Sequence, residues 1–260
     1  MARMIESERM RMVVWNTAWA SPRSTRGKEL IRRIRHATPE FAVLTEATVP
    51  FLEALGSNHV TSNTDYGYES NGERRKVALW SSRCFSDEDP LGSPELPPGR
   101  FVAATLHGPL GPLRVLGVCI PWSHAHVTSG RRDARAWAEH LKYLEVLRPI
   151  ATGLRRPTVL AGDFNQRIPR ARQPKRVVEP LLPILTELNC VTEGRIPPLG
   201  RQAIDHIAVS RDLGAAGVRA LDDRFGDTRI SDHFGLQADL VQESRSGPID
   251  ALDPAGSGTR

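Results

Sequence analysis

Thr158-Val-Leu-Ala-Gly-Asp-Phe-Asn165 joins a short apolar run to polar residues. Thr158 to Ala161 has the length and composition of a buried strand. Gly162 lets the backbone turn, so that Asp163 and Asn165 can both face one cleft. Because an α/β sheet usually presents its site at the ends of its strands, Asp163 and Asn165 are candidates for chemistry.

Polar clusters recur at the boundaries of other apolar runs. They are Asn16 after residues 12–15, Glu46 after residues 41–44, Asp205-His206 within residues 204–209, and Ser231-Asp232-His233 before residues 234–240. A single Asp or Asn after a strand is more often a turn or cap residue, and a lone His beside an Asp is more often a surface pair. Five clusters in chain order, each at a strand boundary, favour convergence on one site.

Short strands with few helices between them predict an α/β or α+β layered domain around a buried sheet core. Helices are expected over Lys28–Arg35 and Arg132–Leu147, with Pro149 just past the end of the second. The expected strands cover residues 12–15, 41–44, 77–80, 101–106, 113–120, 158–161, 204–209 and 234–240. No internal repeat or single linker divides the chain. We expect an extension over residues 1–10, one domain over residues 11–242 and a disordered tail over residues 243–260.

The composition limits the classes of protein that the chain can belong to. Of 260 residues, 40% are hydrophobic, which suits a globular protein with a real core. No apolar run is long enough to span a bilayer, and no secretory signal is expected. Three cysteines favour reduced thiols and a cytoplasmic location. A net charge of +5 weakly favours a polyanionic partner such as nucleic acid.

The polar clusters are rich in oxygen donors and contain no paired cysteines, which suits a hard cation such as Mg²⁺ or Mn²⁺. Such an ion neutralises phosphate oxygens and stabilises the charge that builds on them. A histidine beside a carboxylate, as in Asp232-His233, can donate to a phosphoryl oxygen or carry a proton.

A basic segment follows Asn165 directly. Residues 166–176 hold five positive charges and no acidic residue. The candidates for substrate binding there are Arg170, Arg172, Lys175 and Arg176; a solvated basic loop is an equal alternative. Trp19 or Trp122 could stack on a base, although a tryptophan is more often part of the core.

From about Arg11 to Val241 the chain resembles the endonuclease/exonuclease/phosphatase superfamily, which has the deoxyribonuclease-I-like fold. The resemblance is carried by Trp15-Asn16, Thr45-Glu46, Val77–Ser81, Gly162–Asn165, Ile204–Ile207 and Ser231–His233. It implies a four-layered α/β sandwich of two packed mixed β-sheets flanked by helices, with the site at one edge. It also implies Mg²⁺- or Mn²⁺-dependent hydrolysis of a phosphoester.

The resemblance also implies roles for individual residues. Glu46 matches the principal metal ligand, with Asn16 and Asp232 nearby. The catalytic set it implies consists of Asp163, which orients or deprotonates the attacking water, Asn165 at a phosphoryl oxygen or the nucleophile, His233 at the scissile phosphate and Asp205 orienting His233. Residue identity leaves open which group is the base. The chain departs from the family where many members carry a His or Tyr, because it has Cys119 and Trp122 in that neighbourhood. His124 or His126 could fold back to fill this role.

A nuclease acting on phosphodiesters is the leading expectation. One alternative is a phosphatase or phosphodiesterase of a small or lipid-linked phosphate. A second, from another class, is a catalytically inactive nucleic-acid-binding protein of the same fold. The oligomeric state stays open.

Overall fold

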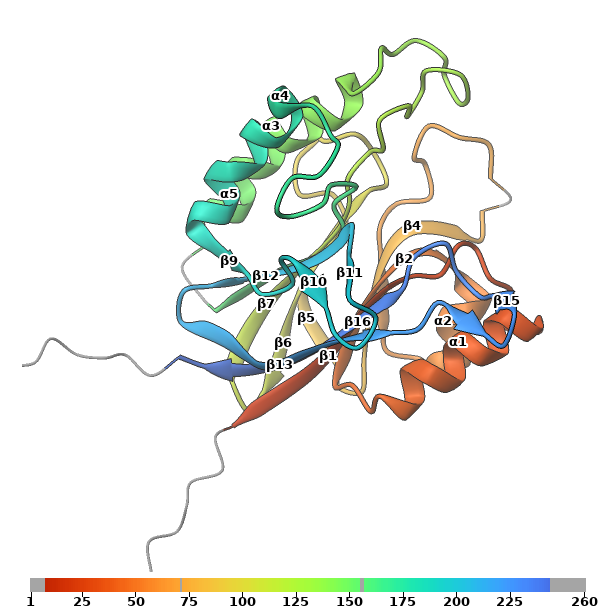
Figure 1. Cartoon of the computed structure of the whole chain (residues 1–260), viewed down its shortest axis with the longest axis vertical. Coiled ribbons are helices and arrows are strands. Elements are labelled where there is room, and N and C mark those ends of the chain that lie inside the picture. The colour runs from red at the N-terminus through yellow and green to blue at the C-terminus, as the bar shows by residue number, and fades with distance from the viewer. Residues whose placement is uncertain (1–7, 71, 155–156, 244–260) are drawn as a thin grey trace, which may run out of the picture.

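Two six-stranded sheets pack face to face in the computed structural model, which describes residues 8–70, 72–154 and 157–243 (Figure 1). The first sheet contains, in spatial order, β13 (Leu213–Leu221), β16 (Gly235–Gln242), β1 (Arg9–Asn16), β2 (Phe41–Thr48), β4 (Arg74–Ser81) and β3 (His59–Thr61). The second contains β5 (Phe85–Asp89), β6 (Phe101–Gly108), β7 (Gly111–Cys119), β8 (Thr158–Asp163), β12 (Asp205–Ser210) and β9 (Leu188–Cys190). Both sheets are mixed, because β1 pairs with β2 and β7 with β8 in parallel, whereas the other pairs are antiparallel.

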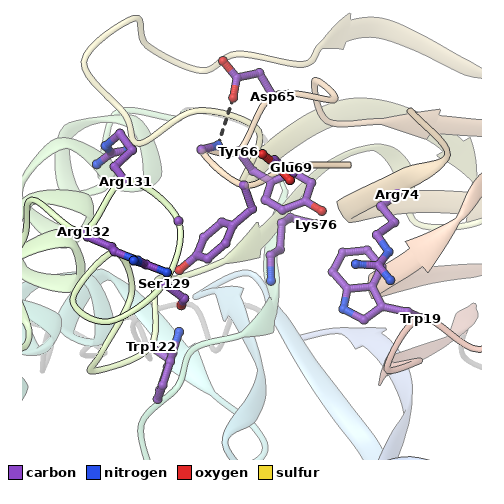
Figure 2. A pocket seen from close by; sticks show the side chains of 13 residues that line it. Trp19, Asp65, Tyr66, Glu69, Arg74, Lys76, Trp122, Ser129, Arg131 and Arg132 are labelled. Carbon is purple, nitrogen blue, oxygen red and sulfur yellow. Dashed lines mark hydrogen bonds between the residues drawn. The ribbon is translucent and has the colours of Figure 1, made fainter. Parts of the chain in front are cut away.

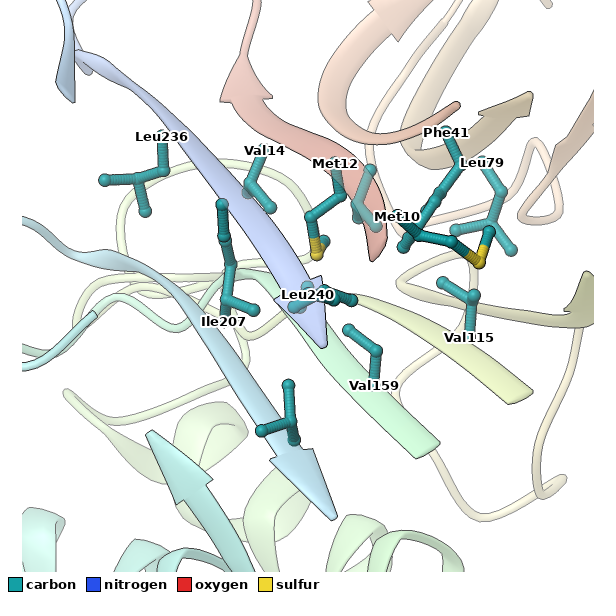
Figure 3. Close-up of a cluster of buried hydrophobic side chains, with 14 of the residues drawn as sticks. Met10, Met12, Val14, Phe41, Leu79, Val115, Val159, Ile207, Leu236 and Leu240 are labelled. Carbon is teal, nitrogen blue, oxygen red and sulfur yellow. The ribbon is translucent and has the colours of Figure 1, made fainter. Parts of the chain in front are cut away.

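The largest hydrophobic cluster fills the space between the sheets (Figure 3). Met10, Met12 and Val14 of β1 belong to this cluster, whereas Val13 and Trp15 belong to a cluster on the opposite face of the same strand. Successive side chains of a strand point to opposite faces. Both faces of β1 are therefore buried, which explains why the run reads as continuously apolar in the sequence.

Helices cover the outer face of each sheet and complete the expected four layers (Figure 1). The first sheet is covered by α1 (Thr25–His36) and α2 (Val49–Leu55); the Ser24 side chain accepts a hydrogen bond from the backbone N–H of Gly27 and so caps α1. The second sheet is covered by α3 (Ala138–Thr152) with the short α4 (Lys175–Val178), η1 (Glu179–Leu181) and α5 (Leu182–Glu187). Two-stranded ribbons pair β10 (Arg195–Ile196) with β11 (Arg201–Gln202) and β14 (Arg224–Phe225) with β15 (Thr228–Arg229).

The helix predicted over residues 132–147 begins later and ends later than expected. Arg132 and Trp137 have left-handed φ values of 59° and 72°, so α3 begins only at Ala138. The backbone N–H of Ala134 bonds to the carbonyl of His126, and that of Trp137 to the carbonyl of Ser123. These two backbone N–H groups are thus bonded to the preceding loop, and the residues before Ala138 do not form a regular helical turn. At the other end α3 continues through Pro149 to Thr152.

The first strand begins two residues before the expected start of the domain at Arg11. β1 starts at Arg9, inside the expected N-terminal extension, because Arg9 and Met10 pair with Val241 and Leu240. Most of the expected extension (residues 1–7) and of the expected tail (residues 244–260) lies outside the described residues. Among the described residues, no helix combines the length and the apolar character that crossing a membrane requires.

Candidate active site

A pocket of about 290 Å³ lies at one edge of the sandwich, and we call it the central pocket. Its lining consists of Asn16, Glu46, Lys76, Arg100, Cys119, Trp122, Asp163, Asn165, Asp232 and His233. Six of the seven site residues expected from the sequence are in this lining. The seventh, Asp205, is hydrogen-bonded to His233. Segments that lie more than 200 residues apart in the chain therefore meet in one small pocket.

The first sheet contributes Asn16 and Glu46 from neighbouring parallel strands. Asn16 ends β1, is buried, and accepts a hydrogen bond from the backbone N–H of Ala18 through its side-chain oxygen. Glu46 has a φ of 49°, an uncommon conformation for a residue other than glycine. Such strain is typical of functional positions. The Glu46 carboxylate lies 2.7 Å from Nζ of Lys76 on the adjacent β4, which places a positive charge against it.

The second sheet contributes Asp163 and Asn165 at the end of β8. The Asp163 carboxylate accepts hydrogen bonds from the backbone N–H and the side-chain amide of Asn165, at 2.9 and 3.0 Å. Gly162 has a φ of 133°, and a Cβ there would lie 2.0 Å from the carbonyl oxygen of Val118 on β7. Only glycine therefore allows β8 to reach the pocket at this point. Burial is the main cause that raises the pKa of Asp163 to about 7, and the Asp205 and Glu46 carboxylates add to it.

His233 and Asp205 form a close pair at the back of the pocket. The Nδ1 atom of His233 lies 2.6 Å from Oδ2 of Asp205, which is 1% exposed. Burial alone would lower the pKa of His233, but the Asp205 carboxylate outweighs this and raises it to about 10. The imidazole is thus held in its protonated form, and with Nδ1 bound to Asp205 its Nε2 is the nitrogen left for a ligand.

The loop before β16 fixes the position of this histidine. The Trp15 indole donates a hydrogen bond to the carbonyl of His233, and the Ser231 hydroxyl donates to the carbonyl of Asn16. Both bonds tie the loop to the end of β1. Asp232, between Ser231 and His233, is exposed and lines the mouth of the central pocket.

Two sets of residues could hold a metal ion. Ligand atoms of Asp163, Asp205 and His233 lie within 4.8 Å of one another. In this set Nδ1 of His233 is already engaged by Oδ2 of Asp205 at 2.6 Å, so the two groups serve each other as partners. The set formed by Glu46, Asn16 and Asp232 offers oxygen donors, which suit Mg²⁺ or Mn²⁺. The Lys76 ammonium at Glu46 shows that this carboxylate already attracts a cation.

Arg100, directly before β6, is a site residue that the sequence did not reveal. It is 2% exposed, lines the central pocket, and lies beside Cys119, whose carbonyl oxygen is 3.4 Å from Nη1. Its Nη2 is buried without a hydrogen-bond partner among the described residues. Its guanidinium places a positive charge in the wall of the central pocket, which favours an anionic ligand. No polar cluster marks Arg100 in the sequence, so only the fold could identify it.

The residues around Cys119 do not supply another phosphate donor. Burial raises the pKa of the Cys119 thiol to about 12, so the side chain stays protonated. His124 and His126, which could have filled the role of the missing family residue, are both absent from the lining of the central pocket. His126 instead stacks on Tyr68, with ring centroids 4.5 Å apart.

A second pocket of about 400 Å³, the arginine pocket, lies beside His233 and shares Asp232 and His233 with the central pocket. It is lined by Arg167, Arg195, Arg201 and Arg229 together with Asp205, Asp223 and other residues. The four basic residues expected to bind substrate lie elsewhere on the exposed surface: they are Arg170, Arg172, Lys175 and Arg176, which line neither pocket. Of the basic segment, Arg167 alone lines the arginine pocket.

The comparisons with known proteins agree with this architecture. The model of the Endonuclease/Exonuclease/phosphatase family matches residues 13–233. An endonuclease/exonuclease/phosphatase from Beutenbergia cavernae has a TM-score of 0.65 and 20% identity, covering 90% of this chain and 72% of that one. The 3'-5' exonuclease NExo from Neisseria meningitidis has a TM-score of 0.65 and 20% identity, covering 88% of this chain and 98% of that one. Humanized D. rerio TDP2 has a TM-score of 0.63 and 14% identity, covering 89% and 98%.

A search of the curated proteins finds no match. The structural likenesses fall under 25% identity and therefore show the fold alone. The family match, in contrast, covers most of the chain and includes every cluster that forms the central pocket. The chain therefore belongs to the endonuclease/exonuclease/phosphatase family.

Proposed function

We propose that the protein is a divalent-metal-dependent hydrolase of phosphoester bonds, and that its substrates are the phosphodiesters of a nucleic acid. The observation that carries this proposal is the central pocket, which is lined by carboxylates, two amides, a histidine and a buried arginine. The family generally uses divalent metal ions. Anionic ligands for such an ion and cationic donors for a phosphate are both needed for phosphoester hydrolysis.

Glu46, Asn16 and Asp232 would hold the ion, Mg²⁺ or Mn²⁺. When bound, the ion neutralises phosphate oxygens and stabilises the charge that develops on them. His233 would donate from Nε2 to a phosphoryl oxygen, and the positive charge of Arg100 in the wall of the pocket would favour the bound phosphate. Arg100 would in this way compensate in part for the His or Tyr that many family members carry near Cys119.

Asp163 would receive a proton from the attacking water. It is 4% exposed, faces the pocket, and is held by two hydrogen bonds from Asn165. A pKa of about 7 lets this carboxylate accept a proton near neutral pH. Asn165 has the left-handed φ of 53° and would orient the water or the phosphate beside Asp163.

The arginine pocket favours a polynucleotide over a small phosphate. Of the four arginines in this pocket, Arg201 and Arg229 pair with Asp223, which leaves Arg167 and Arg195 to bind phosphates that are not cleaved. The likeness to NExo from Neisseria, described as a 3' phosphatase bound to a product DNA hairpin, also supports a nucleic-acid substrate.

The direct test is hydrolysis of bis-p-nitrophenyl phosphate with Mg²⁺, Mn²⁺ or EDTA. We expect ion-stimulated hydrolysis by the native protein and at least a 100-fold loss in Glu46→Ala, with an unchanged circular dichroism spectrum. Glu53→Ala, on the exposed face of α2, is the matched control. Full activity in Glu46→Ala would refute the assignment of Glu46. Absence of hydrolysis with every ion would favour the inactive binding protein. Comparing plasmid DNA, RNA and inositol phosphates then identifies the substrate class.

A further inference from the structure

We infer that a third pocket, next to the central pocket, receives an unstacked base of a single-stranded polynucleotide while the adjoining phosphate lies at Glu46 and His233. This inference rests on the proposed function and names its substrate more closely. The pocket has a volume of about 910 Å³, and we call it the aromatic pocket (Figure 2). Lys76 and Trp122 line both pockets, so the two cavities adjoin.

Four aromatic side chains surround the aromatic pocket: Trp19, Tyr66, Tyr68 and Trp122. Trp19 and Tyr66 are stacked at 6.1 Å between centroids, and Tyr66 and Tyr68 are 5.8 Å apart. These three rings support one another and form a fixed wall. Trp122, in contrast, stands on the opposite side in Figure 2 and is 46% exposed. Water-exposed indole surface beside an active site is well suited to stacking on a base.

The charged residues of the aromatic pocket favour an anionic ligand. Arg74, Lys76, Arg131 and Arg132 outnumber Asp65 and Glu69 in the lining. Lys76 is paired with Glu46, and Arg131 with Asp133 and Glu139. The Arg74 guanidinium lies over the Trp19 ring at 5.1 Å. Arg132 makes no side-chain hydrogen bond or ion pair with another described residue, and Figure 2 shows it directed toward the cavity.

The backbone keeps Arg132 and Trp19 in unusual conformations. Arg132 has a φ of 59°, and Ala18 and Trp19 have φ values of 47° and 57°. Left-handed backbone at residues other than glycine costs free energy and is typical of ligand-binding positions. The backbone N–H of Trp19 donates a hydrogen bond to the carbonyl of Glu46. This bond links the aromatic wall directly to the central pocket.

The combination of an exposed aromatic ring with cationic side chains favours a polynucleotide over other phosphate-containing substrates. An inositol phosphate would use the arginines but offers no aromatic face to Trp122. A lipid would need a continuous apolar surface, which the charged lining interrupts. In a duplex the faces of the bases are stacked on one another and cannot contact Trp122. A single strand satisfies both the aromatic and the charged residues.

Binding can be measured without hydrolysis, by the anisotropy of a fluorescent thymidine hexamer in EDTA. We expect Trp122→Ala to weaken binding at least fivefold, Arg132→Ala to weaken it similarly, and Trp122→Phe to restore most of the affinity. A blunt hairpin whose stem contains the same six thymidines between G·C pairs should lose less than twofold in affinity with Trp122→Ala. Phe225→Ala is the matched control, because Phe225 is 51% exposed and lines none of the three pockets.

A second arm compares two esters with the same leaving group, in the presence of Mn²⁺. They are thymidine 5'-(p-nitrophenyl phosphate) and methyl p-nitrophenyl phosphate. We expect kcat/KM to favour the nucleoside ester in the native protein, and Trp122→Ala to reduce this ratio at least fivefold. An unchanged ratio together with unchanged hexamer binding would overturn the base site and leave the proposed hydrolysis intact. An equal loss of affinity for inositol hexakisphosphate and the hexamer would also overturn it. Loss of hexamer binding in Trp122→Ala without hydrolysis of either ester would support the base site and refute the proposed activity.

Discussion

The hydrogen bond between Nδ1 of His233 and Oδ2 of Asp205 crosses from one sheet to the other. His233 precedes β16 of the first sheet, and Asp205 begins β12 of the second. Asn16 and Glu46 likewise come from the first sheet, whereas Asp163 comes from the second. The central pocket is therefore made where the two sheets meet, and its geometry depends on their packing.

Asp205→Asn should reduce kcat on bis-p-nitrophenyl phosphate by about 10³ to 10⁴, because an amide cannot stabilise the protonated ring in the same orientation. KM should change much less, since Asp205 is behind His233 and does not line the central pocket. Steady-state kinetics with Mn²⁺ would measure both constants. Asp227→Asn, at an exposed turn, is the control. A kcat within threefold of the native value would contradict the positioning role of Asp205.

Lys76 and a metal ion are expected to compete for Glu46. Replacing Lys76 by Met removes the ammonium group 2.7 Å from the carboxylate and should tighten Mn²⁺ binding severalfold. Glu46→Gln should weaken it. Isothermal titration with Mn²⁺ at low salt measures both effects, and Lys142→Met on the exposed face of α3 controls for the change in net charge. Equal Mn²⁺ affinity in the native protein and Glu46→Gln would place the ion elsewhere.

The salt dependence of nucleic-acid binding distinguishes phosphate contacts in the arginine pocket from phosphate contacts in the basic segment. If Arg167 and Arg195 contact phosphates, replacing both by Ala should lower the slope of log K against log salt by about 2. Neutralising Arg170, Arg172, Lys175 and Arg176 tests the interpretation made from the sequence that the loop binds phosphate. Affinity for a labelled oligonucleotide at several salt concentrations would separate them. A flattened slope in the loop variant alone would assign the phosphate contacts to the loop.

Glu29 predicts a pH dependence of stability that is independent of the site. Hydrogen bonds from Arg32, aided by Arg33 and opposed by burial, lower the pKa of Glu29 from 4.5 to about 2. A carboxyl with a lowered pKa in the folded state stabilises the fold above its unfolded pKa and loses this contribution as the pH falls toward the folded value. Glu29→Gln should therefore lower the Tm at pH 7 by a few degrees.

The difference in Tm between Glu29→Gln and the native protein should shrink as the pH falls from 4.5 to 2. Thermal unfolding followed by circular dichroism across this range is the measurement. Glu53→Gln in α2 should show no such trend, because Glu53 is exposed. A Tm difference that is constant with pH would contradict the role of the Glu29 carboxylate.

The sequence was sufficient to predict the layers and most of the central pocket, because doubly buried strands such as β1 and β8 read as apolar runs with polar ends. The sequence was insufficient where tertiary contacts determine a structure that the local composition does not indicate. β13 was missed because its glycines and alanines resemble a loop. The start of α3 was wrong because hydrogen bonds to the preceding loop replace the first helical turn. Arg100 was missed because its burial and its place in the pocket lining depend on residues that are distant in the sequence.

β16 lies between β1 and β13, and its register places Arg9 opposite Val241. One edge of β1 therefore stays unpaired until β16, more than 200 residues later in the chain, has been made. Because His233 leads directly into β16, the strand that pairs with β1 also carries His233 to the central pocket. A nascent chain can therefore neither pair this edge of β1 nor hold His233 against Asp205 until β16 has been made.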